Sequence, residues 1–178
     1  MKRFITLTFI ILTVSFTSSA QTNRAFRKGF QGSVEIGNSA VFGKDKAGGL
    51  MELTLTPGYR TGYGLFLGAG MGIGYNLATN DYVIPAYFDA KYNFLDRKVS
   101  PFAGIRTGIR FNGSPSSCIG NFIILSGGID AGAFSIRLGY EYAANRYRQP
   151  VYRDHSWVTD VTTLEKPSML FCSFAVNF

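Results

Sequence analysis

Charged side chains recur at alternate positions along several segments of the chain, where they could form a buried ionic network. In residues 82–94 the even positions are apolar or aromatic, while Asp89 and Lys91 occupy odd positions. The polar parity of such segments collects five acids and five bases: Glu35, Glu52, Asp89, Asp130 and Glu141 against Arg60, Lys91, Arg106, Arg110 and Arg137. Because a charge away from water is costly unless it is paired, these near-equal numbers predict a compensated network.

His155 and Ser156 could belong to a nucleophilic site, since Asp154 and Asp160 are close by in the sequence. Adjacent His and Ser side chains can seldom face each other productively, and catalytic groups need rigid placement. We therefore expect a solvated loop here and no catalytic residues. A single His without a cluster of further ligands also predicts no metal site.

The glycines of residues 68–74 suggest a nucleotide-binding loop at first sight. Their spacing is strictly two, which differs from the G-x-G-x-x-G pattern, and no helical pattern follows them. We expect no cofactor. These glycines more plausibly make space for Phe66, Tyr87 or Arg106, or permit strong curvature of a strand.

A period of two dominates the sequence and predicts β-strands, because successive side chains of a strand point to opposite faces. No apolar run after residue 20 is long enough for a membrane-spanning helix. Eight segments show the alternation, an even number as an antiparallel sheet closed in a membrane requires. They lie near 30–37, 51–60, 63–75, 82–94, 103–112, 121–132, 134–142 and 169–178.

The predicted connections alternate between short and long. Short turns are expected near 60–62, 96–98 and 132–133, and longer loops near 43–48, 77–80, 113–120 and, above all, 144–167. This asymmetry is typical of outer-membrane barrels, which have short periplasmic turns and long outer loops.

The distribution of side-chain volume favours a membrane barrel over a soluble one. Eight strands enclose room only for side chains or one small ligand. Here the apolar face carries bulky Tyr, Phe, Leu and Ile, and the polar face carries many glycines, serines and threonines. The sequence therefore predicts an all-β fold, an eight-stranded antiparallel up-and-down transmembrane β-barrel.

The first twenty residues are typical of a cleavable signal peptide, with Lys2 and Arg3 before an apolar stretch and small residues at 18–20. We expect residues 1–20 to be removed and residues 21–178 to form one barrel domain. The formal charge of +7 then falls to +5, but the basic residues are not clustered on a helical face, and no nucleic-acid partner is expected. A disulfide between Cys118 and Cys172 is not expected, since the predicted layout places one at the outer rim and the other near mid-membrane.

The chain also resembles a known family. Residues 85–94, the Asp96-Arg97-Lys98 turn and residues 99–104 look like the small outer membrane protein β-barrel domain family of Bacteroidetes, which is porin-superfamily-like. The terminal residues 170–178 resemble the signal that the barrel-assembly machinery reads, and Gln21 after the cleavage point is typical of exported proteins in those bacteria. The resemblance implies an integral protein of the cell outer membrane and brings no catalytic motif.

The region 142–157 is the strongest candidate for an outer binding surface. Arg side chains bind phosphate through two hydrogen bonds, and aromatic residues anchor at membrane interfaces. An aromatic girdle that holds lipopolysaccharide phosphates is one interpretation, and a docking loop for an envelope protein or glycan at 144–167 is the other. The candidate contact residues are Arg146, Arg148, Tyr152, Arg153 and Trp157.

Three functions remain open from the sequence. The first is a non-enzymatic structural or surface-interaction protein whose lumen is filled by the charged network, with outer-membrane lipid and lipopolysaccharide as partners. The second is a narrow gated pore for small solutes or ions, whose ion pairs rearrange. The third and least favoured is an enzyme that modifies lipid A or phospholipid.

Overall fold

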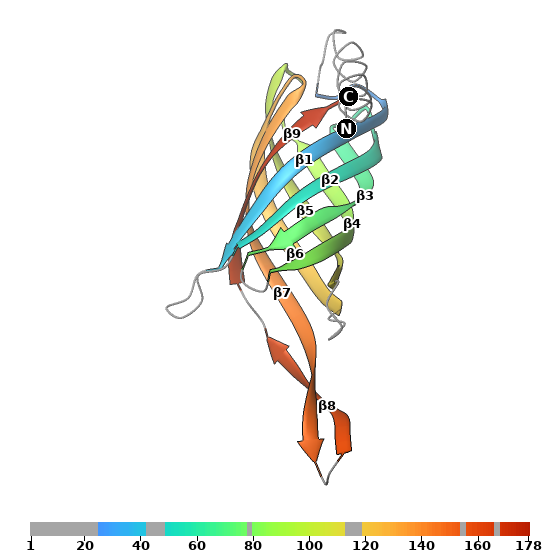
Figure 1. Ribbon diagram of the computed structural model, residues 1–178. Helices are drawn as coiled ribbons and strands as arrows, with labels where there is room; N and C mark the ends of the chain where they lie inside the picture. Colours follow the sequence, from blue (N-terminus) through green and yellow to red (C-terminus); the bar gives the residue numbers. More distant parts are fainter. Residues whose placement is uncertain (1–24, 42–48, 78–79, 113–118, 154–155, 166–167) are drawn as a thin grey trace, which may run out of the picture.

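The computed structural model describes residues 25–41, 49–77, 80–112, 119–153, 156–165 and 168–178 (Figure 1). At residues 41, 112, 119, 145–153 and 156–165 it describes the backbone alone. The predicted signal peptide lies outside the described residues and stays a prediction. The described part forms nine strands: β1 (Gly29–Val41), β2 (Gly49–Arg60), β3 (Leu65–Asn76), β4 (Asp81–Asn93), β5 (Val99–Asn112), β6 (Ile119–Ala131), β7 (Phe134–Arg153), β8 (Ser156–Glu165) and β9 (Ser168–Asn177).

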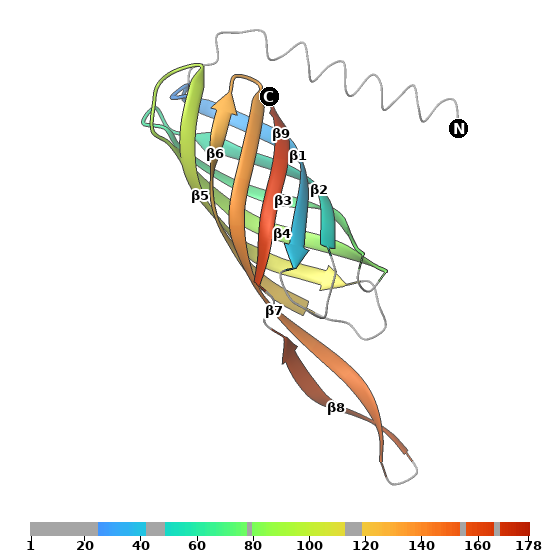
Figure 2. The same ribbon diagram turned by 90° about the vertical axis from the view of Figure 1, so that its left-hand side faces the viewer.

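Eight of these strands close into a barrel. Hydrogen bonding joins them in the order β6, β5, β4, β3, β2, β1, β9 and β7, and a further pairing of β6 with β7 closes the ring. Every pairing is antiparallel, and both views show the tilted strands of the closed wall (Figures 1 and 2). The prediction of an eight-stranded antiparallel up-and-down barrel is confirmed. In the described residues there is no helix with the length and apolar character needed to cross a membrane.

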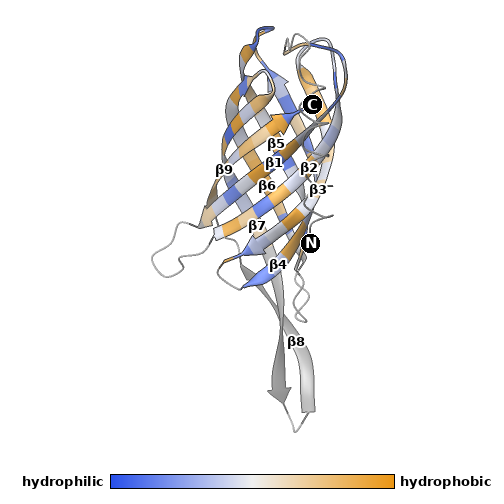
Figure 3. Cartoon of the chain, turned by 45° about the horizontal axis from the view of Figure 1, so that its top comes forward, coloured by the Kyte–Doolittle hydropathy of each residue, from blue (hydrophilic) through white to orange (hydrophobic). Residues whose placement is uncertain are grey.

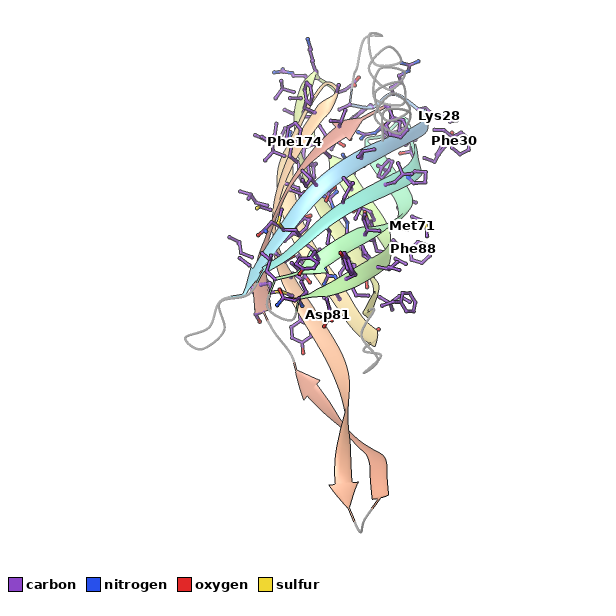
Figure 4. The ribbon with its side chains drawn as sticks, in the orientation of Figure 1. Lys28, Phe30, Met71, Asp81, Phe88 and Phe174 are labelled. Atoms are coloured by element: carbon purple, nitrogen blue, oxygen red, sulfur yellow. The ribbon has the colours of Figure 1, made fainter. Side chains whose placement is uncertain are left out.

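Side chains alternate across the barrel wall as the period of two requires. In β2, buried and exposed residues follow one another along most of the strand. Large apolar side chains point outward, for example Leu53, Leu125 and Phe88, which are 49%, 57% and 72% exposed. Figure 3 shows apolar and polar residues alternating along the strands, and Figure 4 shows Met71, Phe88 and Phe174 directed away from the wall. The outer surface is therefore apolar, which suits a lipid environment.

The prediction of a long outer loop at 144–167 is wrong, because most of this segment forms strands. β7 continues to Arg153 and β8 returns from Ser156 to Glu165, so this segment is a β-hairpin whose last described pair is Arg153 with Ser156. β8 pairs only with β7 among the described strands, and the hairpin projects well beyond the barrel (Figures 1 and 2). The missed signal is the run of β-branched and aromatic residues at 157–163, which favours extended structure.

The barrel has two different ends. We call the end with the connections 61–64, 94–98 and 132–133 the turn end, and the end from which the hairpin projects the loop end. The residues before β1 lie against the turn end, where the amide of Phe26 donates to the carboxylate of Asp96 at 3.1 Å. The last residue joins the same end, because Phe178 exchanges backbone hydrogen bonds of 2.9 Å with Gly32.

Candidate functional site

The charged residues that share the inward parity lie inside the barrel and are buried. They form three clusters along the barrel. We call these the turn-end cluster, the central cluster and the loop-end cluster. Their members are Arg60, Lys91 and Asp130 at the turn end, Glu35, Asp89, Arg106 and Arg137 in the centre, and Glu52, Arg110 and Glu141 at the loop end.

The central cluster spans the barrel from β1 to β5. Arg106 donates two hydrogen bonds to the carboxylate of Glu35, at 2.8 and 2.9 Å, and a third of 3.2 Å to Asp89. Asp89 also accepts two bonds from Arg137, at 3.1 and 2.9 Å. Bidentate hydrogen bonds between an Arg and a carboxylate fix both the distance and the relative orientation of the two side chains. The central cluster therefore ties four strands together through the lumen: β1, β4, β5 and β7.

The loop-end cluster holds one cation between two acids. The Nε and Nη2 of Arg110 donate to Glu52 at 2.8 and 3.3 Å, and its Nη1 donates to Glu141. Glu141 also accepts a hydrogen bond of 2.6 Å from the hydroxyl of Ser39. Because β1, β2, β5 and β7 all contribute to this cluster, it braces opposite walls of the barrel.

The turn-end cluster is centred on Asp130. Its carboxylate accepts from Lys91 at 3.0 Å and from the amide of Asn93 at 2.7 Å, and the hydroxyl of Ser135 also donates to it. Arg60 approaches Asp130 at 3.6 Å. Arg60 donates further bonds to the side chains of Asn93 and Gln31 and to the carbonyl oxygen of Ala25, at 2.6, 2.7 and 2.6 Å.

Aromatic rings accompany all five buried cations. The guanidinium carbon of Arg106 lies 4.2 Å from the ring centre of Tyr87, and that of Arg110 lies 4.0 Å from Phe122. Such contacts add electrostatic attraction, and the attraction is stronger for a buried cation than for an exposed one. The other rings are Phe66 with Arg60 and Lys91, Phe102 with Lys91 and Arg137, and Phe171 with Arg106. Sequence reasoning missed Phe102, Phe122 and Phe171, although their parity matches that of the charges.

The glycines of β3 leave room for two of these rings. A Cβ on Gly70 would lie 2.4 Å from the ring of Tyr87, and one on Gly68 would lie 2.9 Å from Phe66. The prediction that these glycines make space for Phe66 and Tyr87 is confirmed. The ring of Tyr87 in β4 passes over Gly70 of β3, and its hydroxyl lies 2.8 Å from the hydroxyl of Thr56 in β2.

Side chains fill the central part of the interior. A cavity lined by members of the central and turn-end clusters has a volume of about 20 Å³. This corresponds to roughly one water molecule. Taken as ionised, the turn-end cluster has two cations and one acid, the central cluster two of each, and the loop-end cluster one cation and two acids. The network is compensated as a whole, with a polarity along the barrel axis.

The candidate outer contact residues lie on the hairpin. Arg146, Arg148, Tyr152 and Arg153 belong to β7, Trp157 belongs to β8, and Tyr152 pairs with Trp157 across the ladder. Asp154 and His155 lie outside the described residues, and Ser156 begins β8. The structure thus places the backbone of the rim candidates on two paired strands, from Arg146 at the base of the hairpin to Arg153 at its far end.

Two further predictions from the sequence concerned the cysteines and metal binding. Cys172 is exposed on the outer face of β9 and forms no disulfide within the described residues, and Cys118 lies outside them. No group of three or more His, Cys, Asp or Glu side chains in the described ranges could hold a metal ion.

A closed barrel with an apolar outer surface and a charged interior defines the class of small transmembrane β-barrels. Among solved structures, the chain is similar to Neisserial surface protein A (NspA), with a TM-score of 0.51 and 16% sequence identity. The similarity covers 84% of this chain and 97% of that protein. At this level of sequence identity it shows a shared fold and nothing more. No family model and no curated protein matches the chain. The resemblance to the Bacteroidetes family therefore rests on the residues quoted above.

Proposed function

We propose that this chain is an integral outer-membrane protein with a non-enzymatic structural or surface-interaction role. The apolar belt of outward side chains supports a position within lipid, with Leu53, Phe88 and Leu125 as members. The likeness to a barrel that is itself named a surface protein agrees with this position. In this arrangement the turn end faces the periplasm, and the hairpin of β7 and β8 is displayed outside the cell.

The observation that carries the proposal is the three-level ionic network inside the barrel. Arg106, the central cation, is 2% exposed and held by two carboxylates and the ring of Tyr87. An ion or solute would have to displace such paired groups in turn, and breaking one buried pair costs about 3–5 kcal/mol. We therefore favour a filled scaffold over the gated pore. The purified barrel in a planar lipid bilayer should show no single-channel conductance steps, and measurable steps would favour the pore.

The projecting hairpin supports the interaction role. Closing β7 onto β9 needs only a short connection, yet the chain continues the ladder to the pair Arg153 and Ser156. The exposed edge of such a ribbon can add a strand from another protein. We propose that the hairpin contacts an envelope protein, and that Arg146, Arg148 and Arg153 with Tyr152 and Trp157 contact lipopolysaccharide phosphates. We also propose that the segment 170–178 is read by the barrel-assembly machinery during insertion.

Photo-crosslinking in living cells tests the interaction role. A photoreactive residue replaces Tyr152 on the hairpin, and the adducts are identified by mass spectrometry. The matched control places the same residue at Tyr63, an exposed tyrosine of the turn end. We expect a discrete protein adduct from position 152 that is missing from position 63. Lipopolysaccharide adducts alone would leave a structural barrel, and the absence of any adduct at 152 would contradict the displayed hairpin.

A further inference from the structure

A second cavity opens at the turn end of the barrel, and its volume is about 280 Å³. Five separate parts of the chain line it: the residues before β1 with the first residues of β1, the end of β2, the connection between β4 and β5, the end of β6 with its turn, and the last two residues, Asn177 and Phe178. It is much larger than the interior cavity, and its lining residues belong to the turn end, whereas the hairpin projects from the loop end. We call it the vestibule. Apart from Arg60 and Asp130, the charged side chains that line it belong to none of the three interior clusters.

The vestibule is strongly basic. Five cations line it, Arg27, Lys28, Arg60, Arg97 and Lys98, against the single side-chain carboxylate of Asp130. That carboxylate is already engaged, since Lys91, Asn93 and Ser135 all donate to it.

The four exposed cations of the vestibule have no acidic partner in the described part of the chain. Arg27, Lys28, Arg97 and Lys98 take part in no ion pair with a described residue. The nearby carboxylate of Asp96 accepts instead from the amide of Phe26. Four unpaired cations around one hollow create a positive field that attracts an anion.

The rim of the vestibule is aromatic. Phe30 lines it and is 90% exposed, and its ring packs edge-to-face on Tyr59 with centres 5.4 Å apart. Figure 4 shows Lys28 and Phe30 together at the turn end, with Asp81 at the opposite end of the wall. Aromatic side chains of this kind gather where a membrane protein passes through the headgroup layer. The vestibule therefore lies at headgroup level if the barrel spans a membrane.

We propose that the vestibule binds the phosphate group of an anionic phospholipid from the leaflet on the turn-end side. Arg27 and Arg97 would hold the phosphate oxygens, Lys28 and Lys98 would add charge, and Phe30 would lie beside the first part of the acyl chain. The volume falls just below the range of about 300–1,000 Å³ that holds a drug-sized ligand, and so it suits a headgroup. The assignment to a lipid rests on the proposed membrane position, whereas the anion site rests on the cavity and its charges.

The test uses the full barrel purified in an uncharged maltoside detergent. Short-chain phosphatidylglycerol is titrated into it, and binding is followed by calorimetry and by phosphorus NMR. One variant combines Arg27→Gln with Arg97→Gln, two exposed positions outside the interior network. The control combines Lys44→Gln with Lys46→Gln, which makes the same change in charge within the segment between β1 and β2. Circular dichroism verifies that each variant keeps its strands.

We expect one bound lipid per barrel, with affinity about tenfold or more weaker in the vestibule variant and unchanged in the control. Equal affinity in all three proteins, or an equal loss in both variants, would overturn the site. Inorganic phosphate is titrated in parallel. Saturation at a concentration similar to that of the lipid would support the anion site and overturn its assignment to a lipid. These outcomes are independent of the crosslinking at Tyr152, so the two proposals can fail separately.

Discussion

Arg106 holds the centre of the barrel interior together. It bonds Glu35 through two hydrogen bonds and Asp89 through one, and it stacks on the ring of Tyr87. Among the described residues Glu35 forms an ion pair with Arg106 alone, whereas Asp89 keeps Arg137 when Arg106 is removed. The two acids therefore depend on Arg106 to different extents, and Glu35 would be left as an uncompensated buried charge.

The substitution Arg106→Met keeps much of the side-chain length and removes the charge. We expect it to lower the free energy of unfolding by about 3–5 kcal/mol, because Glu35 loses its partner inside the barrel. The measurement is urea unfolding in lipid vesicles, followed by circular dichroism.

The control for this residue is the double variant Arg106→Met with Glu35→Gln. Neutralising Glu35 removes the unpaired charge, so the double variant should be more stable than Arg106→Met by about 0.5–3 kcal/mol. If both variants unfold at the same urea concentration, Glu35 and Arg106 are not coupled and the central cluster does not stabilise the barrel.

At the scale of elements, β7 belongs to two structures at once. Its first part, up to Tyr142, pairs with β9 in the barrel wall, and its last part, from Asn145, pairs with β8. β6 also pairs with β7 as far as Arg146. Beyond that point the hairpin shares no ladder with the barrel strands, so its contribution to barrel stability should be small.

Replacing residues 146–164 with Asn-Gly tests this independence. Asn145 and Glu165 face each other in the ladder, so a two-residue turn can join them. We expect the shortened protein to fold with an unfolding midpoint close to that of the full chain, because every barrel pairing but one is kept. The protein adduct expected at position 152 has no counterpart in this variant. A barrel that fails to assemble would show that the hairpin is part of the folding unit.

At the scale of the whole molecule, the apolar outer surface and the charged interior reverse the arrangement of a soluble barrel. Ile105 and Leu125 face each other in the β5–β6 ladder and are both exposed, while Arg106 beside them is buried. Such a surface is stable only where lipid covers it, since an apolar belt of this extent in water would drive aggregation.

The substitution Leu125→Arg places a charge on this belt, beside the level of the central cluster. Arg at mid-bilayer on the lipid face costs about 2–4 kcal/mol, and near the interface it costs about 0–1 kcal/mol. We expect losses of these sizes for Leu125→Arg and for the control Phe30→Arg at the turn end. Unfolding in lipid vesicles measures both. Equal losses would mean that depth in the membrane does not distinguish these two positions.

The barrel and the face on which each of its side chains lies could be predicted from the amino-acid sequence. A strand has a period of two, so the spacing of Asp89, Lys91, Arg106 and Arg110 states which residues share a face before any partner is known. The count of alternating segments and the short turns between them predicted the eight strands of the wall. The two-residue period of a strand was enough to predict these features, because they depend only on residues that are close together in the sequence.

The pairing of the buried charges and the position of the vestibule depend on how the whole sheet folds. Glu35 and Arg106 are 71 positions apart and pair across the lumen, which depends on the register and closure of the whole sheet. The vestibule likewise joins Arg27, Arg60 and Arg97, which no periodic pattern links. The hairpin at 144–167 was misjudged because a strand outside the wall buries no face, and so it lacks the clean alternation that burial imposes.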